Sequence, residues 1–532
     1  MSTLAELFPA GGGKQANFTA SGAIDAGAPV TLNADGTISE ISSSSSSADL
    51  PLGSTATMVS NGTNVKLAAA HADPFNHNRW AFVWLEDILD GTDTIYVKFI
   101  TRSSNSLTVS PARTVMAAGG NNDNRPGANA CWCTHVANKL LIGNDGENAN
   151  STRGQAVVVT VSGSAGSETI SVGTPHKFSA YQFAGDSQNW KSPFVPIGTT
   201  GNYLAGAAVN SKLYATILTV TGTTITSDSN DTELSEGSIT SGNMADIAVN
   251  PFNPTEGATV YTGTSYQFRM SHFTISGTTL TKGTERSPLS IPDNKLHQRP
   301  TIKYVADGKA VVITKDQEVT SSRDHWYAFV ATISSSSISA GTHVSWTPSH
   351  PASVRAEYQA SISNSPNTPT VFVATWIGGG THYPFCRVGT VNTSNNTVSF
   401  GTDTQMDSSN TSQTNQAILA VSQSHGEGGY FLVSWHDDND VWVRLGKTGG
   451  SFSNFEDIMT GAGGHIGIAD SAISDGASGS VTVKGGIYTS LSSLTIGADY
   501  YLQENGTIGT TSTSFKLGRA LSATTIDLEY QS

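Results

Sequence analysis

The chain has 532 residues, a formal net charge of −14 at pH 7 and a sequence pI near 5.3. This acidic balance excludes the basic face that is typical of nucleic-acid-binding proteins, and it disfavours adsorption to anionic membranes. No apolar run reaches the ~18 residues of a transmembrane helix, and the N-terminal residues lack the basic start and apolar centre of a signal peptide. We therefore expect no nucleic-acid partner, no membrane insertion and assembly in a cytoplasm.

Charged residues make up only 13% of the chain, and glycine alone contributes 54 residues. Amphipathic stretches with a period of 3.6 residues are nearly absent after the first dozen residues. Runs of serine and threonine separate short apolar segments. This composition predicts an all-β protein whose surface is kept soluble by hydroxyl and amide groups rather than by charge.

Two short segments come first in the chain. Residues 1–15 are either a disordered tail or a docking peptide, in which Leu4, Leu7 and Phe8 form one apolar turn. Residues 16–52 are expected to form a small β-module, with a hairpin at the Asp-Gly pair of residues 35–36 and a polyserine linker after it.

Residues 53–460 contain one four-strand unit written seven times. The expected second strand of each unit recurs at steps of about 50 to 65 residues, near the upper end of propeller repeat lengths. Four short strands per unit, with the second and third buried, are typical of a blade of a β-propeller. The second strands are expected at Trp80–Trp84, Leu140–Ile142, Tyr203–Ala207, Thr259–Thr262, Ala310–Ile313, Val371–Thr375 and Tyr430–Ser434. The sequence thus predicts a seven-bladed β-propeller, with a β-sandwich as the alternative.

Turn residues recur at one place in the unit, between its first and second strands. The segments 73–76, 250–253 and 364–367 each combine proline with asparagine or aspartate, which favour turns. For ring closure we expect Thr55–Ser60 to be the inner strand of the first blade. Ser451–Phe455 would be the outer strand of the last blade. Each blade would then be built from contiguous sequence, without strand exchange at the seam.

Residues 461–532 form a second small β-module in this interpretation. Gly497–Ile508 aligns with Gly27–Ile38 of the N-terminal module. Glycines and aromatic residues of the C-terminal module follow a pattern that resembles a module of tailed bacteriophages. The pattern comprises Ile487, Gly497, Tyr500–Leu502 and Lys516–Ser522. That module ends many of their virion proteins, tail-fibre-like ones especially. The resemblance covers only the two flanking modules.

The resemblance implies a non-enzymatic bacteriophage virion structural protein of the tail or fibre apparatus. It implies other virion proteins and further copies of the chain as partners, contact with host surface glycans, and a location in the virion after assembly in the host cytoplasm. Alternatives are a capsid decoration or head-fibre protein and a carbohydrate-binding lectin, with a glycan-cleaving enzyme as the least supported.

A ring of polar side chains is the candidate ligand site. Several blades are expected to enter their inner strand through a polar or basic residue near a proline, and inner strands begin at one mouth of the central channel. Such donors could hold an anionic sugar or a carboxylate, or they could bond blade to blade. The residues are Arg125, Trp190, Lys191, Gln298, Arg299, Arg355 and Gln416.

Signals for catalysis, metals and cofactors are weak. The repeated Asp-box turn of sialidases is missing, and acidic residues such as Asp246 and Glu357 do not pair as glycosidase carboxylates do. The aspartates of 437–440, and those at 87, 90 and 93, fit hairpin turns as well as they fit Ca²⁺. We therefore expect no enzyme activity, no metal and no cofactor.

Tryptophans and cysteines are expected to serve packing. Five tryptophans fall on central strands, which favours packing between blades over stacking on sugars. The three cysteines are expected to be buried reduced thiols, because no zinc-ligand spacing occurs. The tryptophans are Trp80, Trp84, Trp376, Trp435 and Trp442, and the cysteines are Cys131, Cys133 and Cys386.

Overall fold

The structure is a computed structural model of the chain. It describes residues 14–529 apart from 34, 42–49, 61–64, 87–92, 104, 119–128, 145–154, 179–193, 210–211, 228–230, 237–244, 264–266, 289–294, 319–323, 347–360, 366, 378–382, 408–418, 426–428, 437–439, 449–464, 504–506 and 512–515. Every regular element in these ranges is a β-strand. No helix long and apolar enough to cross a membrane occurs in this part of the chain.

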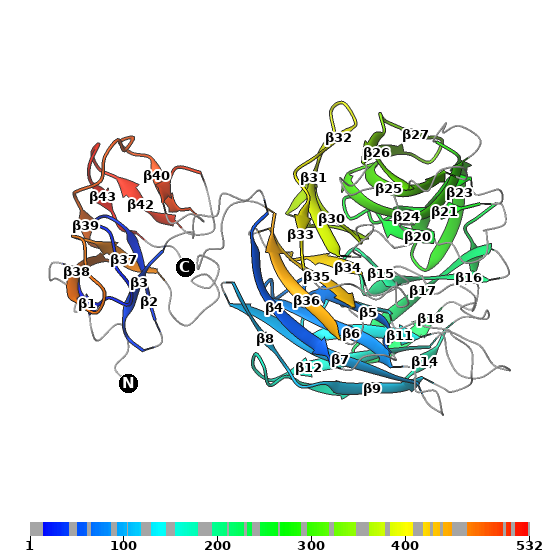
Figure 1. The fold of residues 1–532 in the computed structure, drawn as a ribbon, viewed down its shortest axis with the longest axis horizontal. Helices are drawn as coiled ribbons and strands as arrows, with labels where there is room; N and C mark the ends of the chain where they lie inside the picture. The colour runs from blue at the N-terminus through cyan, green and yellow to red at the C-terminus, as the bar shows by residue number, and fades with distance from the viewer. Residues whose placement is uncertain are drawn as a thin grey trace. The chain divides into compact units, whose positions relative to one another are not determined.

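Seven antiparallel sheets of one design account for most strands (Figure 1). The inner strands are β5 (Val65–Ala72), β10 (Asn129–Trp132), β15 (Phe194–Ile197), β20 (Ala245–Val249), β24 (Lys295–Ala306), β29 (Ser361–Ser365) and β34 (Ala420–Gln423). The second strands are β6 (Arg79–Glu86), β11 (Lys139–Asn144), β16 (Asn202–Val209), β21 (Glu256–Thr262), β25 (Lys309–Glu318), β30 (Thr368–Ile377) and β35 (Tyr430–His436). Each second strand falls where the repeat in the sequence places it.

The third and outer strands complete the sheets. The third strands are β7 (Asp93–Ser103), β12 (Gln155–Ser162), β17 (Lys212–Thr221), β22 (Phe268–Ser276), β26 (Asp324–Ile333), β31 (Pro384–Asn392) and β36 (Val441–Lys447). In five sheets the outer strand is split in two: β8 (Ser106–Val109) and β9 (Arg113–Ala118), β13 (Thr169–Val172) and β14 (His176–Lys177), β18 (Thr224–Ser227) and β19 (Thr232–Glu233), β27 (Ile338–Ala340) and β28 (Val344–Trp346), β32 (Thr397–Phe400) and β33 (Thr404–Gln405). The fourth sheet ends in the continuous strand β23 (Thr279–Arg286).

The inner strands lie side by side in a closed circle. In sequence order each inner strand contacts the next, and β34 contacts β5. The expectation of an all-β propeller is therefore confirmed, and the sandwich alternative is excluded because its two sheets would not close a ring.

Ring closure differs from the prediction. The strand β4 (Leu52–Val59) pairs antiparallel with β36 and is the outer strand of the last sheet, not the inner strand of the first. Lys98 of the first sheet donates a hydrogen bond to the carbonyl oxygen of Met58 in this strand. The prediction of no strand exchange was wrong, because the apolar alternation of this segment suits either position and only nonlocal pairing decides. Ser451–Phe455 lies outside the described residues.

The core fills the space between neighbouring sheets. β6 reads RWAFVWLE, and all of its side chains except the last are buried, as expected for a strand covered on both faces. The tryptophan prediction is confirmed for Trp80, Trp84, Trp376 and Trp435, which are buried, whereas Trp442 is half-buried.

The three cysteines are free thiols in buried positions, as predicted. Burial raises the pKa of Cys131, Cys133 and Cys386 above the usual range of a thiol. These thiols therefore stay protonated near neutral pH and serve packing.

Both flanking segments contribute to one shared sheet, in a unit separate from the propeller. Its strand order is β1 (Gln15–Thr19), β38 (Ser478–Val483), β37 (His465–Ala469), β2 (Pro29–Leu32) and β3 (Ile38–Glu40). A second sheet follows in the order β39 (Ile487–Tyr488), β43 (Ile526–Asp527), β42 (Lys516–Ala520), β40 (Asp499–Leu502) and β41 (Ile508–Gly509). Strands from the two chain ends thus interleave where the sequence suggested two separate modules. Of the expected docking peptide or tail, residues 1–15, the first thirteen lie outside the described residues, and Gln15 is the first residue of β1.

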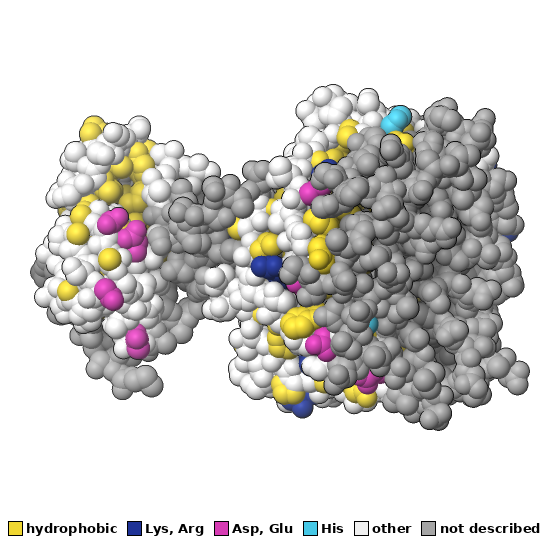
Figure 2. All heavy atoms as spheres, viewed as in Figure 1, with side chains coloured by type: hydrophobic (Ala, Val, Ile, Leu, Met, Phe, Trp, Pro, Cys, Tyr) yellow, Lys and Arg dark blue, Asp and Glu magenta, His cyan; other side chains and the backbone are white. Residues whose placement is uncertain are grey.

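The described surface carries few charged groups. In Figure 2 most described atoms belong to uncharged side chains or backbone, and acidic side chains are spread over the flanking unit. Large exposed hydrophobic side chains occur in the flanking unit at Ile487, Ile496 and Leu521 and in the propeller at Phe75 and Phe252.

Candidate functional site

The propeller has two unlike faces, which follow from the strand directions. Turns between first and second strands, and between third and fourth strands, lie on one face, called the turn face below. The other face is called the loop face. It carries the strand ends that lead from second to third strands and from one sheet to the next. Nearly all residues of the turn face are described, whereas the loop face is described mainly at its strand ends.

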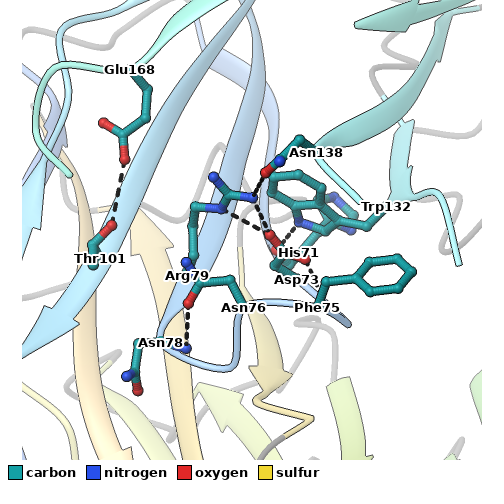
Figure 3. Close-up of polar contacts among 10 residues, drawn as sticks. All are labelled: His71, Asp73, Phe75, Asn76, Asn78, Arg79, Thr101, Trp132, Asn138 and Glu168. Atoms are coloured by element: carbon teal, nitrogen blue, oxygen red, sulfur yellow. Dashed lines mark hydrogen bonds and ion pairs between the residues drawn. The ribbon is translucent and has the colours of Figure 1, made fainter. Parts of the chain in front are cut away.

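A buried ion pair begins a chain of contacts around the turn face (Figure 3). Arg79 donates to Oδ2 of Asp73 from Nε at 2.8 Å and from Nη2 at 2.5 Å, and Nη2 also donates to Asn138 of the second sheet at 2.6 Å. The guanidinium lies over the ring of Trp132, whose Nε1 donates to the carbonyl oxygen of His71. This pair therefore joins the first two sheets.

Contacts of the same kind join the following sheets. Thr134 donates to the Gly198 carbonyl oxygen at 2.6 Å, and the ring of Pro254 lies close to Gly198. The remaining junctions are Asn250 to Asp307 at 2.8 Å, Asn364 to the Tyr304 carbonyl oxygen at 2.7 Å, Asn367 to the His425 carbonyl oxygen at 2.7 Å, and Ser424 to the His77 carbonyl oxygen at 2.5 Å. Every sheet thus contacts both neighbours at its turns or at the strand ends beside them.

Basic residues that open second strands reinforce this arrangement. Lys139 donates to the Gly222 carbonyl oxygen of the next sheet at 2.7 Å, and Lys309 donates to Asn396 Oδ1 of the next sheet at 2.5 Å. Sequence reasoning identified the turns but missed this role. The available signal was the recurrence of a basic residue immediately after the turn in the first, second and fifth units.

The predicted ring of donors consists of residues whose side chains the structure does not describe. Gln298 and Arg299 lie in β24, where the structure describes their backbone but not their side chains. Arg125, Trp190, Lys191, Arg355 and Gln416 lie outside the described residues. Their ligand-binding role stays a prediction.

A cluster of charged side chains lies on the loop face between the third and fourth sheets. We call it the rim cluster, and it comprises Lys212, Glu233, Glu236, Arg269, Lys282, Glu285 and Arg286. These residues come from the start of third strands, the end of outer strands and the segment after β19, except Lys282, which lies in the middle of β23. β23 of the fourth sheet contacts both β17 and β19 of the third.

Hydrogen bonds hold the rim cluster together across the two sheets. Lys212 Nζ donates to Glu233 Oε1 at 2.7 Å and to the Glu236 carbonyl oxygen at 3.0 Å. The Glu236 N–H donates to Glu285 Oε2 at 2.6 Å, and Arg269 Nη1 lies 3.9 Å from Glu285 Oε1. Carboxylates that accept such charge-assisted bonds are fixed in orientation.

The degree of exposure separates the members of the rim cluster. The side chain of Glu285 is only 4% exposed, whereas those of Arg269, Glu233 and Glu236 are 36%, 39% and 63% exposed. Beneath them, burial and then the neighbouring Glu285 carboxylate raise the pKa of Tyr261 above its usual range. Glu285 and Tyr261 therefore support the cluster from inside, while the other three can reach a ligand. Sequence reasoning missed this site, although charged residues at successive strand ends are conspicuous in a chain with so few of them.

Other acidic candidates are used structurally or lie outside the described residues. Asp246 is buried and accepts a bond from the N–H of its neighbour Ile247. The bonds that it accepts from the Thr301 hydroxyl and the Ile302 N–H join β20 to β24. Glu357 lies outside the described residues, as do Asp87, Asp90 and residues 437–439; Asp93 is described in backbone only. Where side chains are described, no group of three or more His, Cys, Asp or Glu residues could hold a metal ion.

The fold defines the chain as a β-propeller protein with a flanking unit built from both chain ends. No family model and no curated protein sequence matches it. Similar solved structures include a Lactobacillus plantarum protein (8% identity, TM-score 0.42, covering 74% of this chain and 96% of that one). An α-L-arabinanase from Penicillium chrysogenum has 10% identity and a TM-score of 0.36 over 74% of this chain and 98% of that one. The NanB sialidase from Streptococcus pneumoniae has 11% identity and a TM-score of 0.38 over 76% and 71%.

These comparisons contradict the expectation of a non-enzymatic bacteriophage virion protein of the tail or fibre. The similar propellers include an arabinanase and a sialidase. A physical reason for the misleading resemblance lies in the turns of the flanking unit. Gly27 and Gly497 have φ angles of 79° and 78°, so the shared glycine pattern reports the geometry of tight turns. We withdraw the virion assignment.

Proposed function

We propose that the chain is a carbohydrate-binding propeller protein that does not cleave its ligand. The rim cluster is the observation that carries this proposal, because it offers half-exposed donors and acceptors in fixed positions on the loop face. Each sugar hydroxyl can both donate and accept. A guanidinium and carboxylates held by neighbouring strands therefore complement adjacent hydroxyls.

Two buried carboxylates, those of Asp246 and Glu285, are engaged in structure and are not available as a catalytic pair. Glycoside hydrolysis uses two carboxyl groups that flank the scissile bond. Asp246 is buried and receives three hydrogen bonds, and Glu285 is almost fully buried and receives the Glu236 N–H. Both groups therefore hold strands together.

The test is a glycan array probed with the purified full chain, combined with analysis of the same glycans after incubation. We expect retention on neutral glycans without release of smaller sugars. An array without signal would overturn the proposal of carbohydrate binding. Release of sugar with turnover would overturn the proposal that the chain does not cleave.

A further inference from the structure

Charge balance in the rim cluster indicates what kind of saccharide fits it. Four cations, Lys212, Arg269, Lys282 and Arg286, face three carboxylates, Glu233, Glu236 and Glu285. Lys212 is bonded to Glu233 at 2.7 Å, and Lys282 lies 3.6 Å from Glu236. An anionic sugar would have to compete with the carboxylates of Glu233 and Glu236, which already neutralise Lys212 and Lys282.

Hydrogen-bonding capacity remains at Arg269. Its Nη2 donates to Gln267 Oε1 at 2.7 Å, and Nη1 lies 3.9 Å from Glu285. A guanidinium has five N–H donors in one plane, more than these contacts use. Its half-exposed edge can therefore donate two parallel bonds to adjacent hydroxyl oxygens.

The segment that carries the acceptors is held before any ligand arrives. Lys212 and Glu285 bind the backbone of Glu236 from the third and fourth sheets, and Ser235 accepts the Leu213 N–H at 3.0 Å. Side chains fixed in this way lose little conformational entropy on binding.

From these observations we infer that the rim cluster binds a neutral saccharide through adjacent hydroxyl groups, with Arg269 donating and Glu233 accepting. This inference rests on the proposed carbohydrate binding and names its site and ligand class. It differs from the predicted ring around the channel, for which an anionic sugar or carboxylate was expected.

Titration calorimetry of the full chain tests the inference with maltohexaose, cellohexaose and laminarihexaose as neutral probes and 3′-sialyllactose as the anionic probe. We expect a neutral hexasaccharide to bind, and Arg269→Gln and Glu233→Gln each to weaken its binding by about tenfold or more. Arg519→Gln is the matched control, because Arg519 is an exposed arginine of the flanking unit beside Asp499, and we expect it to change nothing.

A second measurement needs no variant. Phenylglyoxal modifies exposed arginines, and the neutral saccharide is expected to protect Arg269 but not Arg519 in peptide mass spectra. Neutral binding that is unaffected by both substitutions, with Arg269 unprotected, would overturn this site while leaving carbohydrate binding intact. Preference for 3′-sialyllactose, or failure of all three neutral probes, would overturn the ligand class. A glycan array without signal would overturn carbohydrate binding itself.

Discussion

Ser424 donates a hydrogen bond to the carbonyl oxygen of His77 at 2.5 Å, between residues 347 positions apart in the chain. At the same junction Ser422 Oγ accepts the Ala72 N–H at 3.0 Å, and the Arg102 guanidinium lies 3.7 Å from the centre of the Tyr430 ring. The first and last sheets are therefore joined by side chains as well as by the exchanged strand β4. A propeller closed in this way depends on its N-terminal strand for stability.

Truncating Met58 in β4 tests that dependence. Its side chain is fully buried, so Met58→Ala should lower the free energy of unfolding by about 2–5 kcal/mol through lost burial and a residual cavity. Thr55 on the same strand is exposed, and Thr55→Ala should change it by less than about 0.5 kcal/mol. Urea denaturation followed by tryptophan fluorescence measures both. Equal small effects would mean that β4 does not stabilise the ring.

Substitutions of Asp73 separate its two roles. Asp73→Ala removes the partner of the buried Arg79 and the acceptor of the Phe75 N–H, which lies 2.9 Å from Asp73 Oδ1. We expect Asp73→Ala to lower the free energy of unfolding by about 3–5 kcal/mol, because a buried guanidinium is left without its carboxylate. Asp73→Asn keeps an oxygen that can accept the Phe75 N–H, so it should lower the free energy of unfolding by less.

Lys516→Met provides the comparison for Asp73, since Lys516 forms a more exposed pair with Asp499. An exposed pair should contribute less than about 1 kcal/mol. Chemical denaturation of the three variants and the parent gives the ranking. A loss for Asp73→Ala as small as that for Lys516→Met would contradict the structural role assigned to the ion pair.

Acid should lower the stability of the fold by protonating histidines at the turn face. Burial, followed by the charge of His77, lowers the pKa of His425 to about 4, and burial followed by Lys303 lowers that of His71 to about 4. Both values lie below the ~6.5 of an unfolded histidine. The unfolded chain therefore binds more protons between these values, so stability should fall as pH decreases from about 6.5 to about 4.

The histidine contribution can be isolated by substitution. His425→Gln removes one titrating group, and the plot of unfolding free energy against pH should become shallower in that window. The difference should amount to at most about 3 kcal/mol. Denaturation series between pH 4 and 7.5 measure it. Parallel curves for the parent and the variant would show that the titration of His425 does not contribute to the pH dependence of stability.

A cross-strand pair of Gly389 and Phe372 offers a test of packing. The two residues are paired in register, and a Cβ atom at Gly389 would collide with the Phe372 ring. Gly389→Ala should therefore destabilise the chain by about 1–3 kcal/mol. At Gly401 an added Cβ would make an ordinary contact 3.7 Å from the Val388 carbonyl oxygen, so Gly401→Ala is the control. Differential scanning calorimetry should show a lower melting temperature for the first variant alone.

The sequence by itself determined the local elements of the propeller. Second strands such as Tyr430–His436 are mostly apolar and buried along their whole length, because both of their faces are covered. Turns such as 73–76 carry aspartate, proline and asparagine because these residues favour turn conformations. Both signals are local, since burial and turn geometry act on neighbouring residues. For this reason the repeat could be predicted from the sequence.

Only the tertiary structure decided which segments join. β4 carries an ordinary strand pattern, and its partner β36 lies nearly four hundred residues away. Lys212, Glu233, Arg269 and Glu285 come from four separate strands and meet only when the third and fourth sheets pack together. An edge strand pairs with whichever strand lies beside it in the folded chain, and the same is true of a hydrogen bond between two sheets. Both therefore depend on distance in space and not on distance along the sequence. Neither leaves a periodic trace in the chain. The sequence therefore shows charged residues at strand ends, but it shows neither which of them meet in the rim cluster nor which strand closes the ring.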